Sequence, residues 1–360
     1  MKKILIRSSL GGYQVKNIEI SKNFFSKNLN NYFYLIDKNI YSKNKIIKKI
    51  KGNKILIKSN EDAKNYNNIS KVIKKIIEGN INRESVIVAI GGGIVQDISG
   101  FIASILFRGI KWNFIPTTIL AQCDSCIGGK TSINFNSYKN QLGNFYPPKK
   151  IFLDIRLLST LPLKDIKSGL GEMAHYYLVS NAKDWNFYKK NLKKVLKKNF
   201  DKKIMRSLIF KSLLIKKKFI EKDEFDTGKR LILNYGHTFG HAIEKITNYK
   251  ISHGMAVAHG INIANFFSLK LNLINKEKFE EIENQISKIV NLSELKRMNV
   301  DHFLKIIKKD KKNKNGQIRL ILTRGVGKMF IKSVNKESKF IYLIKEYLSK
   351  RVNKNYPKIK

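Results

Sequence analysis

The sequence contains no long hydrophobic run. Its longest apolar stretch, GFIASILF at 100–107, is far shorter than the roughly 18 residues that a membrane-spanning helix requires. The apolar part of the amino-terminal stretch MKKILIRSSLGGYQ is too brief for a secretory signal, and no small-residue cleavage pattern follows it. We therefore expect a cytoplasmic protein with no membrane partner.

Cysteine is scarce as well. The only two, Cys123 and Cys126, form the motif C-D-S-C. That spacing can serve as a redox pair or as half of a zinc site. Because the sequence has no second cysteine pair and no thioredoxin-like context, we interpret them as small packed thiols in a reducing compartment.

Acidic residues are few: 27 aspartates and glutamates stand against 71 lysines and arginines, which gives a formal net charge of +44. Such an excess raises nucleic acid as a partner. Here, however, the lysines are scattered with Asn and Ile through nearly every segment, as an AT-rich genome would produce. We expect no specific nucleic-acid partner, only an affinity for polyanions that falls steeply with salt.

The chain of 360 residues is longer than one hydrophobic core usually supports, so we expect two domains. In its first part, β-rich runs alternate with segments of helical periodicity such as 69–79 and 94–107. This alternation predicts a mostly parallel sheet flanked by helices. The β-rich runs lie at 2–6, 32–37, 54–58, 85–90, 111–116 and 150–155.

After about residue 156 helical periodicity dominates, and only IRLILTR at 318–324 reads as a late strand. We place the boundary near LSTLP, 158–162, which divides the chain into an α/β domain, 1–157, and a helical domain, 158–360. We expect the active site in the cleft between them. Helices are predicted at 163–179, 204–221, 241–246, 254–271 and 280–290.

Three consecutive glycines, Gly91, Gly92 and Gly93, follow a strand that reads as buried and precede a helical pattern. Without side chains they would let backbone amides and the helix amino terminus approach a pyrophosphate closely. The spacing is not G-x-G-x-x-G, and a tight strand-to-helix turn is the alternative interpretation. Asp97, one turn into the helix, could reach a ribose hydroxyl or cap a local turn.

Polar groups gather in the loop-rich region that follows. A flexible glycine turn before Lys130 can present one ammonium to a phosphate or a carboxylate. A single lysine is more often a solvated surface group, but several convergent polar residues between glycines favour a binding role. The candidates are Thr117, Thr118, Asp124, Lys130, Lys139 and Asn140.

The stretch LNYGHTFGHAIE holds His237 and His241, two of only six histidines. A helix places residues four apart on one face, and this spacing alone favours a zinc pair. The alternative is a polar helix start whose imidazoles are satisfied by backbone carbonyls.

Together these segments resemble the 3-dehydroquinate synthases, a family of sugar phosphate cyclases. The resemblance covers most of residues 60–325 and implies a Rossmann-like α/β NAD-binding domain followed by an all-α domain that binds a metal and the substrate. The matching stretches, in family order, are GGGIVQDISGFIAS, FRGI, PTTILAQCDSCIGGKTSIN, KNQLGNF, GLGEM, KDEFDTGKRLILNYGHTFGHAIE and SHGMAVAHG.

The resemblance implies that the two histidines differ in role. It assigns a divalent metal, zinc or else cobalt, to Glu172, His237 and His253. It makes His241 a substrate-facing histidine that supports proton transfer, so a zinc pair of His237 and His241 is the wrong inference. Two histidines and one carboxylate leave open positions, as catalytic zinc sites do.

The other site residues also follow from the resemblance. NAD binding falls to Asp37, Glu61, Lys64, Gly91, Gly92, Gly93, Asp97, Thr117, Thr118 and Thr160. Catalytic roles fall to His241, Asp226, Lys130 and Lys216. Substrate binding falls to Arg108, Asp124, Lys130, Lys139, Asn140, His175, Lys216, Arg230, Asn234, His241 and one of Lys311 and Lys312.

That basic set suits a substrate with both a carboxylate and a phosphate. The implied substrate is 3-deoxy-D-arabino-heptulosonate 7-phosphate, a small sugar phosphate. The implied sequence is oxidation by NAD, phosphate elimination, reduction that regenerates NAD, ring opening and an intramolecular aldol closure to 3-dehydroquinate. The resemblance also implies a homodimer.

Two positions depart from the family pattern. His175 stands where the family usually has Lys, and a histidine has a shorter reach and an uncertain charge at pH 7. Asp226 stands where the family usually has Glu, so its carboxylate is retracted by one methylene. Tolerated drift is the simpler interpretation, and a specialised or decaying enzyme is the other.

Three other functions compete with the synthase. A related cyclase would act on another sugar phosphate, and an iron- or zinc-dependent alcohol dehydrogenase would accumulate NADH. A basic nucleic-acid-binding protein would show heparin retention with a steep salt slope and no cyclase activity.

Overall fold

A computed structural model describes residues 3–25, 31–136, 138–296, 298–308, 318–334 and 337–349. The chain forms two compact units, Met1–Leu161 with Met205–Asp226, and Pro162–Ile204 with Thr227–Lys360. The expected division into 1–157 and 158–360 differs from these units mainly at Met205–Asp226, which packs with the first unit. Most of one long helix, α7 (Lys202–Ile220), therefore belongs with the sheet despite its later position in the chain.

The first unit is built on a seven-stranded sheet in the order β1-β2-β9-β6-β5-β3-β4, in which only β1 runs antiparallel to its neighbour. Its central strands are almost continuously apolar because both faces are covered. All six predicted strands are present to within two residues, whereas β2 was not predicted. The strands are β1 (Lys3–Ile6), β2 (Tyr13–Asn17), β3 (Tyr32–Asp37), β4 (Asn53–Ile57), β5 (Val86–Gly91), β6 (Lys111–Pro116) and β9 (Lys150–Leu153).

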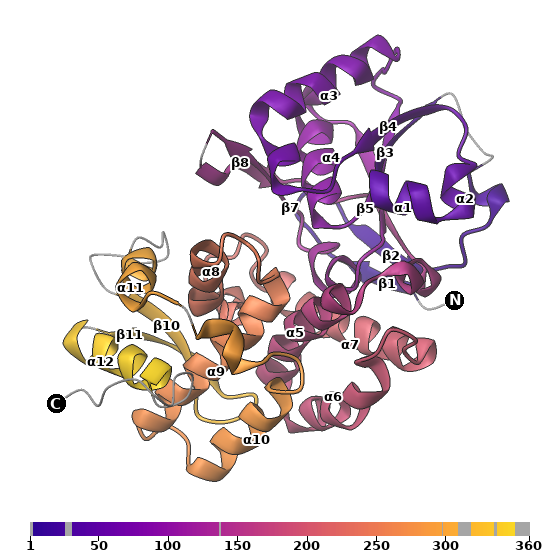
Figure 1. The fold of residues 1–360 in the computed structure, drawn as a ribbon. Coiled ribbons are helices and arrows are strands. Elements are labelled where there is room, and N and C mark those ends of the chain that lie inside the picture. Colours follow the sequence, from indigo (N-terminus) through magenta and orange to yellow (C-terminus); the bar gives the residue numbers. More distant parts are fainter. Residues whose placement is uncertain are drawn as a thin grey trace. The chain divides into compact units, whose positions relative to one another are not determined.

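Helices and a separate hairpin complete the first unit (Figure 1). The helix α3 is amphipathic and turns Ile69 and Ile76 inward, while α4 is buried along most of its length. The hairpin pairs β7 (Lys130–Phe135) with β8 (Tyr138–Phe145) and packs on α4. The helices are α1 (Lys38–Lys43), α2 (Lys45–Lys48), α3 (Tyr66–Glu78), α4 (Gly93–Ile105) and α7.

The strand order fixes where a ligand can bind in the first unit. The strands β3 and β5 are neighbours in the sheet. From β3 the chain continues to β4 at one edge of the sheet, whereas from β5 it continues to β6 in the opposite direction. Open α/β sheets bind their ligands at such a reversal, in the crevice beyond the carboxyl ends of the strands, which here are β3 and β5. Asp37 ends β3 and Gly91 ends β5, so both lie at this crevice.

The second unit is mainly helical, as predicted, with one antiparallel hairpin of β10 (Ile318–Thr323) and β11 (Met329–Val334). The first of these strands matches the predicted late strand, and β11 was not predicted. The helix α9 is buried on nearly every side and forms the centre of the unit. The helices are α5 (Leu163–Ser180), α6 (Ala182–Val195), α8 (His237–Ile246), α9 (His253–Lys270), α10 (Lys276–Ile286), α11 (Val300–Lys308) and α12 (Glu337–Tyr347).

The described residues also bear on membrane-spanning helices and on the two cysteines. None of the helices described is long and apolar enough to cross a membrane. Cys123 and Cys126 are both buried free thiols, and their sulfurs lie 3.6 Å from the carbonyl oxygens of Leu120 and Gln122. They are packed thiols, as their isolation in the sequence predicts.

Candidate active site

Glycines bring three helices of the second unit into backbone contact. A β-carbon built on Gly254 would lie 1.7 Å from the carbonyl oxygen of Ser168, and one on Gly171 would lie 2.1 Å from the carbonyl oxygen of Gly254. Likewise, a β-carbon on Gly260 would lie 2.0 Å from the carbonyl oxygen of Gly236. No larger residue fits at these crossings. The helices α5, α8 and α9 therefore approach closely enough for their side chains to share one site.

At this crossing Glu172 of α5, His237 of α8 and His253 of α9 form a cluster. Oε1 of Glu172 lies 3.5 Å from Nε2 of His237, and its Oε2 lies 3.4 Å from Nε2 of His253. One ligand atom from each residue lies within 4.8 Å of the other two. Glu172 is only 2% exposed, and a carboxylate buried so deeply needs positive charge nearby. Two nitrogens and one oxygen fit a divalent ion that keeps open coordination positions.

The second nitrogen of each of these imidazoles faces a hydrogen-bond acceptor. His237 Nδ1 lies 3.4 Å from the carbonyl oxygen of Tyr235, and His253 Nδ1 lies 3.0 Å from Oε2 of Glu244. Donation from Nδ1 leaves the Nε2 lone pair of each ring directed toward the cluster. Sequence reasoning did not assign Glu244 a role, although its position seven residues after His237 places both on one helix face.

The two other predicted histidines lie at the edge of this cluster. The ring of His241 is half-buried and lies 5.5 Å from that of His237 and 5.8 Å from that of His253. His175 is only 1% exposed, and its Nδ1 lies 3.4 Å from Oε1 of Glu172. His175 thus faces the carboxylate of the cluster rather than solvent.

In the first unit, the glycine run lies at the crevice beyond β3 and β5. A β-carbon on Gly91 would lie 2.7 Å from Val95 and 3.2 Å from the β-carbon of Asp37, so this turn is tight. In contrast, a β-carbon on Gly93 would meet no atom within 4 Å. The amino terminus of α4 therefore faces open space, as an anion-binding helix start requires.

A network of polar side chains continues from this helix. The ammonium of Lys64 lies 2.6 Å from Oδ2 of Asp97 and 2.7 Å from Oδ1 of Asn140. Burial raises the pKa of Asp97, and the adjacent Lys64 opposes that rise. A second pair joins Lys139 to Glu61 at 3.4 Å. Five predicted residues from three separate segments are thus brought together, and Asp97 forms an ion pair rather than a local cap.

Two further ion pairs bring the predicted catalytic residues of the first unit together. Lys216 of α7 lies 2.5 Å from Oδ1 of Asp124, and Lys130 forms an ion pair with Asp226. Asp226 has a φ of 59°, in the left-handed region that Asp tolerates better than most residues. The retracted carboxylate at this position therefore suits its backbone.

The remaining predicted residues are divided between the units. Thr117 is buried and its amide bonds to the Gly91 carbonyl, while the Thr118 hydroxyl accepts from the Ala121 amide. Arg108 and Thr160 are exposed, and Arg108 has a left-handed φ of 67°.

In the second unit Arg230 is buried, and the Asn234 amide donates to the Leu231 carbonyl. Lys311 and Lys312 lie outside the described residues.

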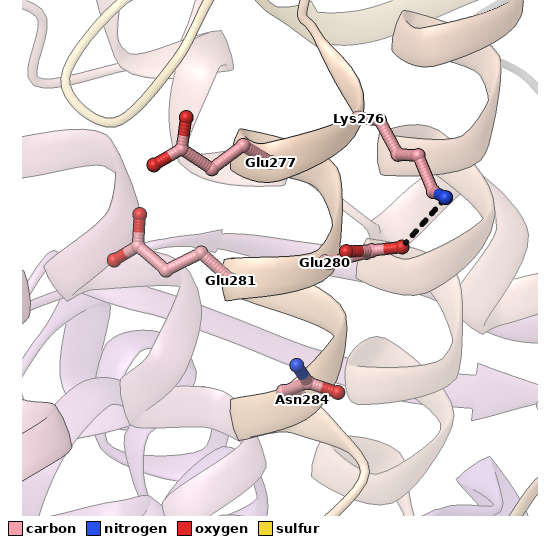
Figure 2. A pocket seen from close by; sticks show the side chains of 5 residues that line it. All are labelled: Lys276, Glu277, Glu280, Glu281 and Asn284. Atoms are coloured by element: carbon pink, nitrogen blue, oxygen red, sulfur yellow. Dashed lines mark ion pairs between the residues drawn. The ribbon is translucent and has the colours of Figure 1, made fainter.

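A separate hollow on α10 carries no comparable chemistry. Figure 2 shows that its lining is mostly acidic and comes from a single helix. Lys276 pairs with Glu280 at 3.7 Å, and Glu281 accepts hydrogen bonds from Trp185 and Lys189. These contacts account for the charges as surface and packing interactions.

Known family patterns match the chain in two consecutive parts. The pattern described as 3-dehydroquinate synthase N-terminal matches residues 54–168, which hold the glycine run. The pattern described as 3-dehydroquinate synthase C-terminal matches residues 169–313, which hold Glu172, His237 and His253. The chain belongs to the 3-dehydroquinate synthase family. The family expected from the motifs is thereby confirmed.

Relatives of this 3-dehydroquinate synthase family member span most of its length. The 3-dehydroquinate synthase of Dictyoglomus turgidum is 39% identical over 295 residues, which are 82% of each chain. That of Helicobacter pylori strain HPAG1 is 36% identical over 286 residues, which are 78% of this chain and 81% of the relative.

Solved structures share the fold. A 2-deoxy-scyllo-inosose synthase complexed with carbaglucose-6-phosphate, NAD+ and Co2+ has a TM-score of 0.85, with 25% identity over 96% of this chain and 100% of its own. The 2-epi-5-epi-valiolone synthase of Streptomyces hygroscopicus, solved with NAD+ and Zn2+ bound, has a TM-score of 0.83. It is 19% identical and covers 94% of this chain and 97% of its own, so it supports the fold alone.

Proposed function

We propose that this chain is a 3-dehydroquinate synthase of the shikimate pathway. It would convert 3-deoxy-D-arabino-heptulosonate 7-phosphate to 3-dehydroquinate and phosphate, a carbon–oxygen lyase reaction. The observation that carries the proposal is the cluster of Glu172, His237 and His253, of which the first two are buried, in a chain that matches both family patterns.

The proposed cofactors are NAD and one divalent metal, with zinc preferred over cobalt. The glycine run and the open start of α4 support a dinucleotide site in the first unit. The donors of Glu172, His237 and His253 support a metal site in the second unit. When bound, the metal would polarise substrate oxygens, and NAD would accept a hydride and return it.

The chain's own residues would bind the substrate and move its protons. Lys130, Lys216 and Arg230 would hold the carboxylate and the phosphate, since an ammonium acts as a point charge and a guanidinium as a two-pronged donor. His241 lies close to the metal cluster without belonging to its ligand set, so it is placed to exchange a proton with a metal-held substrate. Asp226 would accept a proton from another position of the substrate.

A related cyclase that acts on another sugar phosphate is the second candidate. The similarity to 2-deoxy-scyllo-inosose synthase favours it, because that protein shares the fold over its full length. The basic residues favour the first candidate, since Lys130, Lys139, Lys216 and Arg230 exceed what a lone phosphate needs.

A substrate comparison separates the two candidates and the dehydrogenase. Purified chain with NAD and zinc is offered the heptulosonate phosphate or glucose 6-phosphate, and phosphate release and NADH absorbance are followed together. The synthase predicts phosphate from the heptulosonate alone and no net NADH. Phosphate from glucose 6-phosphate alone would favour another cyclase, and accumulating NADH would favour a dehydrogenase.

We also propose that the chain forms a homodimer and resides in the cytoplasm. The family resemblance supports the first statement, and the two buried free thiols fit a reducing compartment. Light scattering coupled to size-exclusion chromatography gives the mass directly. A mass near 41.7 kDa, that of one chain, would contradict the dimer.

A further inference from the structure

Glu244 is a buried acidic residue with no part in the chemistry proposed above. It lies on α8, three residues after His241 and seven after His237, so the helical repeat places all three on one face. Its side chain is only 8% exposed, and its Oε2 lies 3.0 Å from Nδ1 of His253. A carboxylate so buried and so close to a candidate ligand must affect that ligand.

Two chemical roles are open to Glu244. Ligand atoms of His241, Glu244 and His253 all lie within 4.8 Å of one another, so they could hold a second metal ion. Alternatively, Glu244 accepts a hydrogen bond from His253 and fixes the orientation of its ring. The two roles differ in where the imidazole proton lies.

The contacts of His253 favour the second role. Its Nε2 faces Oε2 of Glu172 at 3.4 Å, while its Nδ1 is within hydrogen-bond distance of Glu244. A neutral imidazole carries a single proton, and donation to Glu244 places that proton on Nδ1. The Nε2 lone pair is then directed toward Glu172. A metal on each nitrogen would require the ring to lose both protons.

We propose that Glu244 is a positioning residue for the metal site: it holds His253 in the tautomer and ring orientation that bind the ion through Nε2. A carboxylate in this position also makes the imidazole a stronger ligand. The corresponding contact of His237 is to a neutral carbonyl at 3.4 Å, so His253 depends more on its partner. This inference rests on the proposed metal site at Glu172, His237 and His253.

The chain offers a matched control for this residue. His259 lies on the same helix as His253 and is fully buried, and its Nε2 lies 2.8 Å from Oε2 of Glu294. This second histidine–glutamate pair lies outside both candidate ligand groups. Glu294→Gln therefore changes a histidine–glutamate contact, in which the histidine is buried and the glutamate is exposed, without touching the proposed ligands.

The test compares zinc affinity by competition with a chromophoric chelator in the full-length chain. Glu244→Gln removes the negative charge at nearly constant volume, and we expect zinc binding about 10- to 100-fold weaker with one ion still bound. Glu294→Gln should leave the affinity unchanged. Equal affinity of wild type and Glu244→Gln would overturn the proposal. A different result would assign Glu244 to a second metal site instead: wild type would bind two zinc ions, and Glu244→Gln would bind one ion with undiminished affinity.

Two further measurements separate this inference from the metal site itself. Glu172→Ala should abolish zinc binding; if wild type binds no zinc, the metal site fails rather than the role of Glu244. The nitrogen-15 spectrum of the zinc-free wild type reports the tautomer of His253 without any variant. A proton on Nδ1 agrees with the proposal, and a proton on Nε2 contradicts it even if Glu244→Gln does not fold.

Discussion

The ammonium of Lys216 lies 2.5 Å from Oδ1 of Asp124 and 2.8 Å from the backbone carbonyl oxygen of the same residue. These contacts fasten α7 to the π-helical turn Ala121–Ser125, and the two residues are 92 positions apart in the sequence. Both side chains are largely shielded from water, at 8% and 18% exposure. The pair thus joins two residues of the proposed substrate site inside the first unit.

Replacing Lys216 by Met should destabilise the first unit. The substitution removes the ammonium beside the largely shielded Asp124 carboxylate, and we expect a loss of about 3 kcal/mol, the lower end of the range for a buried pair. Lys217→Met is the control, since Lys217 forms only an i,i+4 surface pair with Glu221 at 3.5 Å, worth about 0.3–0.5 kcal/mol. Urea unfolding measures both. Equal losses of unfolding free energy in the two variants would mean that the Lys216–Asp124 pair contributes no more to stability than the surface pair.

Alanine substitutions in the glycine run should separate cofactor binding from folding. The β-carbon added by Gly93→Ala would meet no protein atom within 4 Å, so the stability of the variant should match that of wild type. Its NAD affinity should fall about tenfold, or 1.4 kcal/mol, because the methyl group occupies the space proposed for the cofactor. Gly91→Ala brings a β-carbon to 2.7 Å from Val95 and should cost about 1–3 kcal/mol of folding free energy. Calorimetric titration with NAD and thermal unfolding measure the two effects. Unchanged NAD affinity in Gly93→Ala would remove the helix start from the cofactor site.

Asp154 should make stability depend on acid pH. Burial alone would raise the pKa of this carboxyl, but hydrogen bonds from Arg156 and from the Ile20 amide outweigh burial and hold its pKa below the usual range. The folded protein therefore binds this proton less readily than the unfolded chain, whose Asp pKa is about 3.9. The stabilisation is fully present above that value and is lost as pH falls toward the folded pKa.

Comparison of wild type with Asp154→Asn measures this contribution. The difference in unfolding free energy should be about 1–3 kcal/mol at pH 6 and should shrink below about pH 4. A difference that does not change with pH would mean that the charge of Asp154 is irrelevant to folding.

His175→Lys restores the residue usual in the family, yet we expect it to damage this chain. The site of His175 is closed, at 1% exposure, and its ring lies 3.9 Å from that of Tyr176 and 5.0 Å from that of His237. A longer ammonium must displace these rings, with a cost of about 2 kcal/mol and weaker zinc binding. Thermal unfolding and chelator competition measure both. If the lysine variant had wild-type stability and a higher turnover, His175 would instead be a substitution that impairs the enzyme.

Patterning predicted the elements that are buried on both faces. The strands β3 and β5 and the helices α5 and α9 have continuous apolar or glycine-rich stretches, and all four were predicted. The strands β2, β7, β8 and β11 were not predicted, because each depends on pairing with a strand that is distant in the sequence or across a turn, which local patterning does not reveal.

The site was predictable only in part, for a similar reason. Local spacing favours His237 and His241 as a pair of ligands, whereas the structure groups His237 with Glu172 and His253 from two other helices. That grouping depends on glycine contacts between backbones, which no local period reveals. Glu244 was missed because a single Glu on a helix face is usually solvated, and its burial becomes visible only in the packed structure.

The most direct measurement of the proposed function follows inorganic phosphate and 3-dehydroquinate together. Wild type and Glu172→Ala are incubated with 3-deoxy-D-arabino-heptulosonate 7-phosphate, zinc and a catalytic amount of NAD. We predict equal amounts of both products with no net NADH in wild type, and neither product in the variant. Absence of both products from folded, zinc-loaded wild type would contradict the synthase assignment.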